Sequence, residues 1–228
     1  MGDTNTLLLL AKYPELGCVK TRLAKDIGER QALQLYKAFF QDSMERFQSD
    51  AYQFALHLSP REAIATCLKT YPIIETIVPQ VNGNLGEKMR SAMENAFENG
   101  AMKVVLIGSD TPHLPPEWIQ NAFDRLDRDD LVLGPTTDGG YYLIGISSPR
   151  LLPVVFESIS WSTSLVLDQT VQRIQKESAS YFLLPFFRDI DTVDELKWCY
   201  EHAAEYGYSQ SQTVAELGVL FFRGSKRF

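Results

Sequence analysis

The chain has 228 residues, with 22 Lys and Arg against 29 Asp and Glu, which gives a formal net charge of −7. This length suits one α/β domain with a core that needs no disulfides, and the 45% of hydrophobic residues excludes global disorder. The acidic balance argues against a protein that wraps a nucleic-acid backbone, but a few cations focused in one cleft can still bind a phosphorylated small molecule.

Cysteine usage and hydropathy bear on the compartment. Cys18, Cys67 and Cys199 are far apart and odd in number, and no CxxC pair occurs. This pattern disfavours a disulfide framework and indicates a reducing compartment. No apolar segment reaches the roughly 18 residues that a membrane-spanning helix requires. We therefore expect a cytoplasmic protein without a membrane span.

Short apolar runs predict the strands. The first run, Leu7–Ala11, is continuous, as expected for a strand that is buried on both faces of a sheet. A later run ends abruptly at Gly108, which begins a turn-rich segment. The expected strands are 7–11, 52–58, 73–78, 104–107, 131–133, 141–146 and 181–187.

Apolar residues at helical spacing predict helices between these strands. Asn84 stands three residues before Glu87, a capping-box-like start, and Ser162 or Thr163 suits the N-cap of a later helix. Strands that alternate with helices indicate an α/β fold, with a mostly parallel sheet covered on both faces. The expected helices are 29–47, 63–69, one from Asn84 to a stop at Gly100, 117–126, 163–176 and 193–206.

The chain shows no internal repeat, low-complexity tract or linker. We therefore expect a single domain over residues 1–228, with a core at about 7–200 and a C-terminal extension at 207–228. The apolar patch Val219–Phe222 and the basic end Arg223–Phe228 belong to this extension. The patch either packs on its own domain or covers a contact in a homo-oligomer.

Three cations lie in the segment between the first strand and the first long helix. They are Lys12, Lys20 and Arg22, and ligands bind beyond the carboxyl ends of strands in open α/β sheets. Lys20 offers a point charge to a phosphate, Arg22 offers a bidentate fork, and Gly17 lets the backbone approach a ligand closely. The glycines of a P-loop are absent, which excludes that motif. The alternative is a solvated basic loop.

Acidic residues follow two further strands. Asp110 comes directly after a short β-branched strand, where a carboxylate can hold Mg²⁺ together with substrate phosphates. Asp189 and Asp191 lie between the last expected strand and the last expected helix. Each has a structural alternative. Asp110 suits a turn, Asp191 or Thr192 suits the N-cap of the helix, and Asp189 suits the positive end of its dipole.

An acid followed by two glycines stands between the strands 131–133 and 141–146. Asp138, Gly139 and Gly140 permit a tight turn and a close approach to a ligand, although Asp-Gly is also an ordinary hairpin pair. Taken together, one cationic loop and several strand-end acids at one sheet edge predict a phosphate-plus-metal site.

Other chemistries fit the sequence badly. The three histidines have no i, i+4 partner or HExxH context, which disfavours zinc. No G-x-S-x-G elbow occurs, and no G-x-G-x-x-G follows the first strand, which disfavours a serine hydrolase and a dinucleotide oxidoreductase. Cys18 lies within the basic loop, where neighbouring cations could lower its pKa, but a spectator thiol is the simpler interpretation.

An ordered series of motifs runs along the chain. The motifs are Lys12-Tyr13-Pro14, Gly17, Lys20-Thr21-Arg22-Leu23, Asn84 to Met89, Gly108 to Pro112, Gly134-Pro135, Asp138 to Leu143, Trp161-Ser162-Thr163 and Asp189 to Thr192. This series resembles the bacterial glycosyltransferase-like proteins of the radical-SAM-associated type. That family belongs to the nucleotide-diphospho-sugar transferase superfamily, so the resemblance implies a Rossmann-like fold of GT-A type, a three-layer sandwich. The basic loop also resembles, more distantly, the phosphate-binding loop of molybdenum-cofactor and phospholactate guanylyltransferases.

The resemblance assigns a role to each motif. Lys20 and Arg22 would contact nucleotide phosphates, and Asp110 would be the principal ligand of Mg²⁺ or Mn²⁺. The Asp-x-Asp of many metal-dependent glycosyltransferases is absent, so a second metal ligand must come from Asp191 or Asp189. The remaining substrate-binding candidates are Lys12, Gly17, Thr21, Asp138, Gly139, Gly140 and Trp161.

These observations favour a metal-dependent, glycosyltransferase-like enzyme that uses a nucleotide-sugar donor. The alternative is a nucleotidyltransferase that releases pyrophosphate from a nucleoside triphosphate, which the basic loop favours because a triphosphate needs more cation contacts. A non-catalytic nucleotide-binding protein is the third hypothesis, and a dead site would have no need of all four of Lys20, Arg22, Asp110 and Asp191. The expected partner is a nucleotide or nucleotide-sugar, not a nucleic acid.

Overall fold

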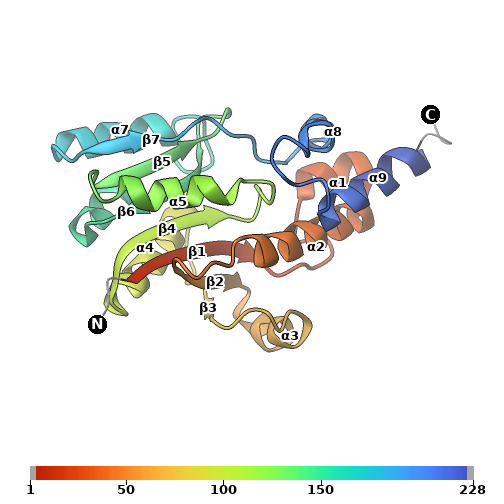
Figure 1. The fold of residues 1–228 in the computed structure, drawn as a ribbon, viewed down its shortest axis with the longest axis horizontal. Coiled ribbons are helices and arrows are strands. Elements are labelled where there is room, and N and C mark those ends of the chain that lie inside the picture. Colours follow the sequence, from red (N-terminus) through yellow and green to blue (C-terminus); the bar gives the residue numbers. More distant parts are fainter. Residues whose placement is uncertain (1–3, 225–228) are drawn as a thin grey trace.

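The computed structural model describes residues 4–224, which form a seven-stranded sheet in the order β3-β2-β1-β4-β6-β5-β7 (Figure 1). All pairings are parallel except those of β6, which runs antiparallel to both of its neighbours. The predicted α/β class with a mostly parallel sheet is confirmed. The strands are β1 (Thr4–Lys12), β2 (Gln53–Ser59), β3 (Ile77–Pro79), β4 (Ala101–Gly108), β5 (Leu131–Pro135), β6 (Tyr141–Ile146) and β7 (Tyr181–Leu183).

The sheet lies between two layers of helices. Successive side chains of a strand point to opposite faces, and β1 accordingly sends Leu7 and Leu9 into one core and Leu8 into the other. The first core includes α2, α5, α8 and α9, and the second includes α4, α6 and α7. The α-helices are α1 (Thr21–Ile27), α2 (Glu29–Arg46), α3 (Ile64–Thr70), α4 (Leu85–Glu98), α5 (Pro116–Arg125), α6 (Leu152–Phe156), α7 (Val166–Lys176), α8 (Val193–His202) and α9 (Gln212–Gly224). Arg61–Ala63 and Pro149–Leu151 form short 3₁₀ helices.

Several boundaries follow the predicted capping chemistry. Asn84 caps α4 in a full capping box with Glu87, and Thr192 caps α8 in another. The predicted N-cap of α7 is wrong. Ser162 adopts a left-handed φ of 64°, so the helix starts only at Val166, and Thr163 instead accepts a bond from the backbone of Leu165.

Four features of the fold differ from the pattern in the sequence. The basic segment is not all loop, because α1 begins at Thr21 within it. The strand expected at 73–78 pairs only at its end, over Ile77–Pro79, and the strand expected at 181–187 ends at Leu183. The helices α6 and α9 were not expected at all. Short or atypical elements give weak periodic signals, so packing rather than pattern decides them.

The C-terminal segment is held against α2. The helix α9 packs beside α2 with Leu217 fully buried, at the end of the molecule away from the start of β1 (Figure 1). Asp42 of α2 accepts bonds from the backbone of Gln212 and Thr213 and from the Tyr208 hydroxyl, at 2.7 to 2.9 Å. The last part of the predicted basic end lies outside the described residues. Between residues 4 and 224, no helix has both the length and the hydropathy needed to cross a membrane.

Replacing the carboxylate that holds α9 should destabilise the fold. Asp42→Ala removes the acceptor of two backbone N–H groups and one hydroxyl, of which only the Tyr208 hydroxyl has another acceptor, the Thr213 hydroxyl at 2.8 Å. We therefore expect a loss of about 3 kcal/mol in the free energy of unfolding. Urea denaturation followed by circular dichroism measures this loss. Asp50→Ala, at an exposed carboxylate in the turn before β2, is the control and should change stability by less than about 0.5 kcal/mol. Equal effects of the two variants would contradict this role of Asp42.

Candidate functional site

A cavity of about 790 Å³ opens where the parallel strands end at their carboxyl termini. This is the position in which open α/β sheets bind ligands. The segments that follow β1, β3, β4, β5 and β7 all contribute to its wall. The charged residues that line it are Lys12, Lys20, Arg22, Lys88, Asp110, Asp138, Asp189 and Asp191.

Lys20 lies at the centre of the charged part of the wall. Its ammonium donates to the backbone carbonyl of Ile190 at 2.6 Å and forms ion pairs with Asp110 at 2.6 Å and Asp191 at 2.9 Å. An ammonium has three donors, so all three are used. Its side chain is 3% exposed. Burial alone would lower the pKa of Lys20, but the two carboxylates outweigh it and raise the pKa above its ordinary value.

The backbone at Lys20 is strained. Lys20 precedes α1 with φ 46° and ψ 44°, a left-handed conformation that side-chain-bearing residues rarely adopt. Such a conformation costs on the order of 1–3 kcal/mol and persists only where the surroundings enforce it. The ion pairs with Asp110 and Asp191 supply that constraint.

The acids come from loops that are bonded to each other. The Ile190 backbone N–H donates to the Asp110 carbonyl at 3.0 Å, which joins the loop after β4 to the loop after β7. Thr192, not Asp191, caps α8, so the Asp191 carboxylate faces Lys20. Arg22 approaches the other oxygen of Asp191 at 3.8 Å, with its side chain 77% exposed.

Asp189 lies among other acids. Burial, with Asp138 and Asp191 nearby, raises the pKa of Asp189 to about 6. Asp138 is fixed in place, because one of its oxygens accepts from the Thr136 hydroxyl at 2.5 Å and the Gly140 N–H at 3.2 Å. This part of the cavity therefore carries an excess of negative charge, which a cation would relieve.

A buried tyrosine links the ends of the two central strands. The Tyr36 hydroxyl from α2 donates to the Lys12 carbonyl at 3.0 Å, accepts from the Lys12 N–H at 3.2 Å and lies 3.0 Å from the Ser109 hydroxyl. Burial raises the pKa of Tyr36 to about 12, so it stays protonated. It joins the backbone at the end of β1 to the Ser109 hydroxyl after β4, next to Asp110.

The structure brings most of the predicted residues to this one cavity. Lys12, Thr21, Gly140 and Trp161 line it, as do the charged residues predicted for the phosphates and the metal. Of the predicted turn alternatives, the hairpin is also correct: residues 136–140 join β5 to the antiparallel β6. This loop is both a hairpin turn and a wall of the site.

Two predicted glycines lie off the wall. Gly17 has φ 76° in a turn, and a Cβ there would contact only Glu29, at 4.0 Å. Gly139 has φ 89°, and a Cβ there would lie 2.2 Å from the Ser164 carbonyl. Gly17 therefore serves the turn, and Gly139 serves the packing of the hairpin against the loop before α7, rather than close contact with a ligand.

Other residues of the wall were missed in the sequence. Gln80 donates to the carbonyls of Ala11 and His57, both at 2.8 Å, and so joins the segment after β3 to the ends of β1 and β2. Gly86 does not itself line the cavity but supports the wall residue Trp161, since a Cβ there would meet the indole at 2.3 Å. Lys88 was quoted only as part of a motif. A polar residue just past a strand was the available signal for Gln80.

The donor set fits a divalent cation that substrate completes. Among residues 4–224, no group of three or more His, Cys, Asp or Glu side chains forms a metal cluster by itself. Asp110 and Asp191 nevertheless converge within reach of one ammonium, and Mg²⁺ commonly takes one or two carboxylates plus substrate phosphates and water. Asp189 is adjacent in the same acidic loop.

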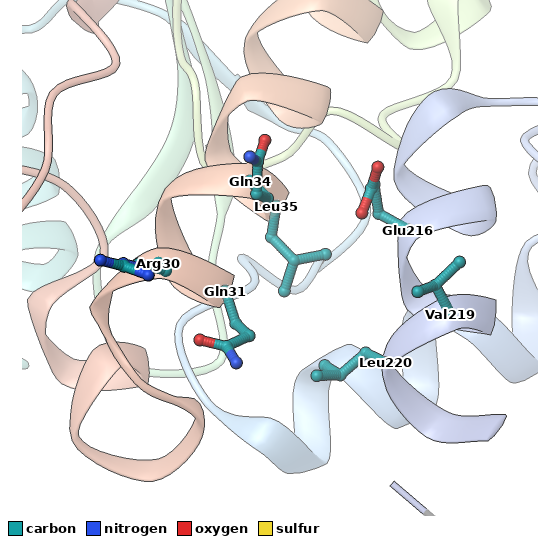
Figure 2. Close-up of a pocket in the computed structure, with 7 residues that line it drawn as sticks. All are labelled: Arg30, Gln31, Gln34, Leu35, Glu216, Val219 and Leu220. Atoms are coloured by element: carbon teal, nitrogen blue, oxygen red, sulfur yellow. The ribbon is translucent and has the colours of Figure 1, made fainter. Parts of the chain in front are cut away.

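A second cavity of about 260 Å³ lies between α2 and α9 (Figure 2). Figure 2 shows side chains from both helices around it, with Gln31 and Leu35 on α2 facing Glu216 and Leu220 on α9. None of the predicted site residues lines it. The chemistry suggested by the sequence therefore belongs to the larger cavity.

The raised pKa of Asp189 predicts that the stability of the fold depends on pH. A carboxyl whose pKa is about 6 when folded and 3.8 when unfolded destabilises the fold once it ionises, so the penalty is complete above pH 6 and vanishes below pH 4. Asp189→Asn should therefore raise the Tm of the ligand-free protein at pH 8, and the gain should shrink as the pH falls to 5. A lower Tm at pH 8 would contradict this electrostatic account.

Two relatives of this chain have names that refer to nucleotide chemistry. A Desulfovibrio desulfuricans protein, provisionally described as a nucleotide-diphospho-sugar transferase, is 33% identical with a TM-score of 0.88, over 97% of this chain and 95% of that one. A 2-phospho-L-lactate guanylyltransferase from Methanocaldococcus jannaschii is 23% identical over 191 residues, 82% of this chain and 79% of the relative.

The fold recurs in a more distant enzyme. CMP:2-keto-3-deoxy-manno-octonic acid synthetase complexed with CTP matches with a TM-score of 0.54 at 9% identity, over 89% of this chain and 99% of that one, which is a likeness of fold alone. These proteins are named as transferases or as a nucleotide-binding synthetase, in line with the predicted transferase.

Residues 43–163, more than half of the chain, match the family described as "Uncharacterized protein conserved in bacteria (DUF2064)". The chain belongs to this DUF2064 family and, as its motifs indicate, to the nucleotide-diphospho-sugar transferase superfamily.

Proposed function

We propose that this protein is a metal-dependent nucleotidyltransferase, which joins a nucleoside monophosphate to a phosphorylated acceptor and releases pyrophosphate. The observation that carries the proposal is the cluster of Lys20, Asp110 and Asp191 on the wall of a cavity of about 790 Å³. A volume of this order accommodates a nucleotide with its acceptor. The guanylyltransferase relative favours this chemistry over transfer of a sugar.

The charge of the cluster limits how it can bind phosphate. Lys20 with Asp110 and Asp191 has a formal net charge of −1, so the cluster itself repels a triphosphate. A divalent cation held by Asp110 and Asp191 would reverse the sign of this three-residue cluster, and an ionised Asp189 beside them would bring the sum to neutrality. Mg²⁺ or Mn²⁺ bound there supplies charge neutralisation at the phosphates. Lys20 then serves to hold both acids in position.

In the proposed reaction, a phosphate oxygen of the acceptor attacks the α-phosphorus of a nucleoside triphosphate. One P–O bond forms at the α-phosphorus, and the bond from it to the oxygen bridging to the β-phosphorus breaks. The electron pair leaves with pyrophosphate, and an ionised acceptor phosphate needs no general base. Arg22, whose side chain is largely exposed at the mouth of the site, is placed to stabilise the charge that develops on the phosphates.

Transfer of a sugar from a nucleotide-sugar is the second candidate. It is favoured by the Desulfovibrio relative, which covers almost the whole chain. In that reaction the sugar–phosphate bond breaks and a nucleoside diphosphate leaves. The two reactions would use the same cations and acids but give different leaving groups, so product analysis separates them. A non-catalytic nucleotide-binding protein would release neither product.

Localisation in the cytoplasm is part of the proposal. Cys18, Cys67 and Cys199 are all free thiols. Unpaired cysteines and a nucleoside triphosphate substrate both suit a reducing compartment supplied with nucleotides.

The test is a product assay with four nucleoside triphosphates, Mg²⁺ and a panel of phosphorylated acceptors that includes 2-phospho-L-lactate. We expect pyrophosphate to appear in step with a nucleotide-linked acceptor. A triphosphate bound at 100 times its dissociation constant should also stabilise the fold by about 2.7 kcal/mol, which a thermal shift detects. Release of a nucleoside diphosphate from nucleotide-sugars, without pyrophosphate from triphosphates, would replace this proposal by sugar transfer.

Asp110→Asn tests the metal assignment. The variant keeps the size of the side chain but removes its charge, so we expect Mg²⁺-dependent binding of the triphosphate to be lost in calorimetry and turnover to fall by about 100-fold or more. Asp168→Asn, at an exposed carboxylate of α7 away from the cavity wall, is the matched control. Unchanged metal-dependent binding in Asp110→Asn would show that the ion binds elsewhere.

A further inference from the structure

Lys88 is a cation of the cavity wall to which the resemblance gives no role. It lies in the first turns of α4, three residues after Leu85 and one before Met89. Residues at i, i+3 and i+4 share one face of a helix, and all three line the cavity. The flanking Met89 is 4% exposed, so this face of α4 is built into the wall.

The charge of Lys88 is not neutralised by the protein. Of the carboxylates in the part of the chain that the structure describes, none lies within 4.0 Å of its ammonium, and the amine makes no hydrogen bond there. The nearest acid in sequence, Glu87, bonds the Asn84 backbone in the capping box. The position itself offers no compensation, because a cation near a helix N-terminus is opposed by the helix dipole. An anion bound in the cavity would supply the missing partner.

Lys12 shares this condition with Lys88, and Arg22 has only one distant carboxylate partner. The Lys12 side chain makes no ion pair within residues 4–224, and Arg22 meets only Asp191, at 3.8 Å. Lys20, by contrast, is held by two acids. The cations available for a direct contact with substrate are therefore Lys12, Arg22 and Lys88.

The helix that carries Lys88 lies over the centre of the sheet. α4 packs against β4 and β1. Lys12 is the last residue of β1, and Asp110 follows β4. These two strands are neighbours in the sheet, whereas β5 and β7, which precede Asp138 and Asp189, lie further along it. A phosphate bound beyond the ends of β1 and β4 would therefore lie in the part of the cavity to which Lys12, Lys88 and Asp110 contribute.

We propose that Lys88 is a substrate-binding residue, whose ammonium contacts a phosphate of the nucleotide donor in the cavity, beyond the ends of β1 and β4. The inference rests on the proposed function for the identity of the donor. The contact with a phosphate rests on the unpaired charge and its place on the wall.

Calorimetry with Lys88→Met tests the contact. The probes are the four nucleoside triphosphates, the corresponding nucleosides and pyrophosphate, each with Mg²⁺. For the triphosphate that the wild type binds, and for pyrophosphate, we expect the Kd to rise about tenfold or more, as for loss of a hydrogen bond to a charged group. Binding of the nucleoside should not change. Lys88→Arg should restore most of the affinity.

Two controls separate binding from folding. Lys37→Met removes an exposed lysine of α2 outside the cavity wall and should leave all affinities unchanged. Removing a cation from the start of α4 should leave the Tm unchanged or slightly higher, because the helix dipole opposes it. A structural lysine would lower the Tm instead.

The outcomes also distinguish the two proposals. Loss of pyrophosphate affinity in Lys88→Met supports the phosphate contact even if no triphosphate is turned over, in which case the proposed function alone fails. Unchanged affinity for both triphosphate and pyrophosphate would overturn the inference. So would an effect limited to the KM of an acceptor, since that would place the contact on the acceptor. A wild type that binds neither probe would overturn it as well.

Discussion

The ammonium of Lys20 organises the site. It joins three segments that are far apart in the sequence, the end of the basic loop, the loop after β4 and the loop after β7, through Asp110, Asp191 and the Ile190 carbonyl. Without this cation, two carboxylates would face each other at the edge of a buried sheet. The left-handed backbone of Lys20 is compatible with this arrangement, because three strong contacts hold the residue in a conformation that it would otherwise leave.

The cations of the cavity have different roles in this arrangement. Lys20 keeps the acids in place and has no donor left over, while Lys12, Arg22 and Lys88 keep theirs. A site built in this way has its carboxylates positioned before substrate arrives, which reduces the rearrangement needed at the moment of reaction. The excess of acid around Asp189 has the same character: it costs stability in the ligand-free protein and is relieved by a bound cation.

Two neutral groups support this charged centre from behind. Tyr36 fixes the ends of β1 and β4. His113, three residues after Asp110, stacks on Phe187 with ring centroids 4.5 Å apart, and burial lowers its pKa to about 3, so it packs as an uncharged ring. Both contacts come from segments distant in sequence. They connect the loops that carry the acids to the hydrophobic core below them.

The α/β class, the buried first strand and the capping box at Asn84 could all be predicted from the sequence, because they depend on local periodicity and capping. The sequence also indicated that the cations and acids belong to one edge, since parallel strands end together. Which charges meet depends on the three-dimensional arrangement of the loops. Lys20 pairs with acids 90 and 171 residues away, Gly17 and Gly139 turn away from the wall, and Lys88 is left without a partner. Such pairings depend on loop geometry and burial across the whole sheet, which no local pattern encodes.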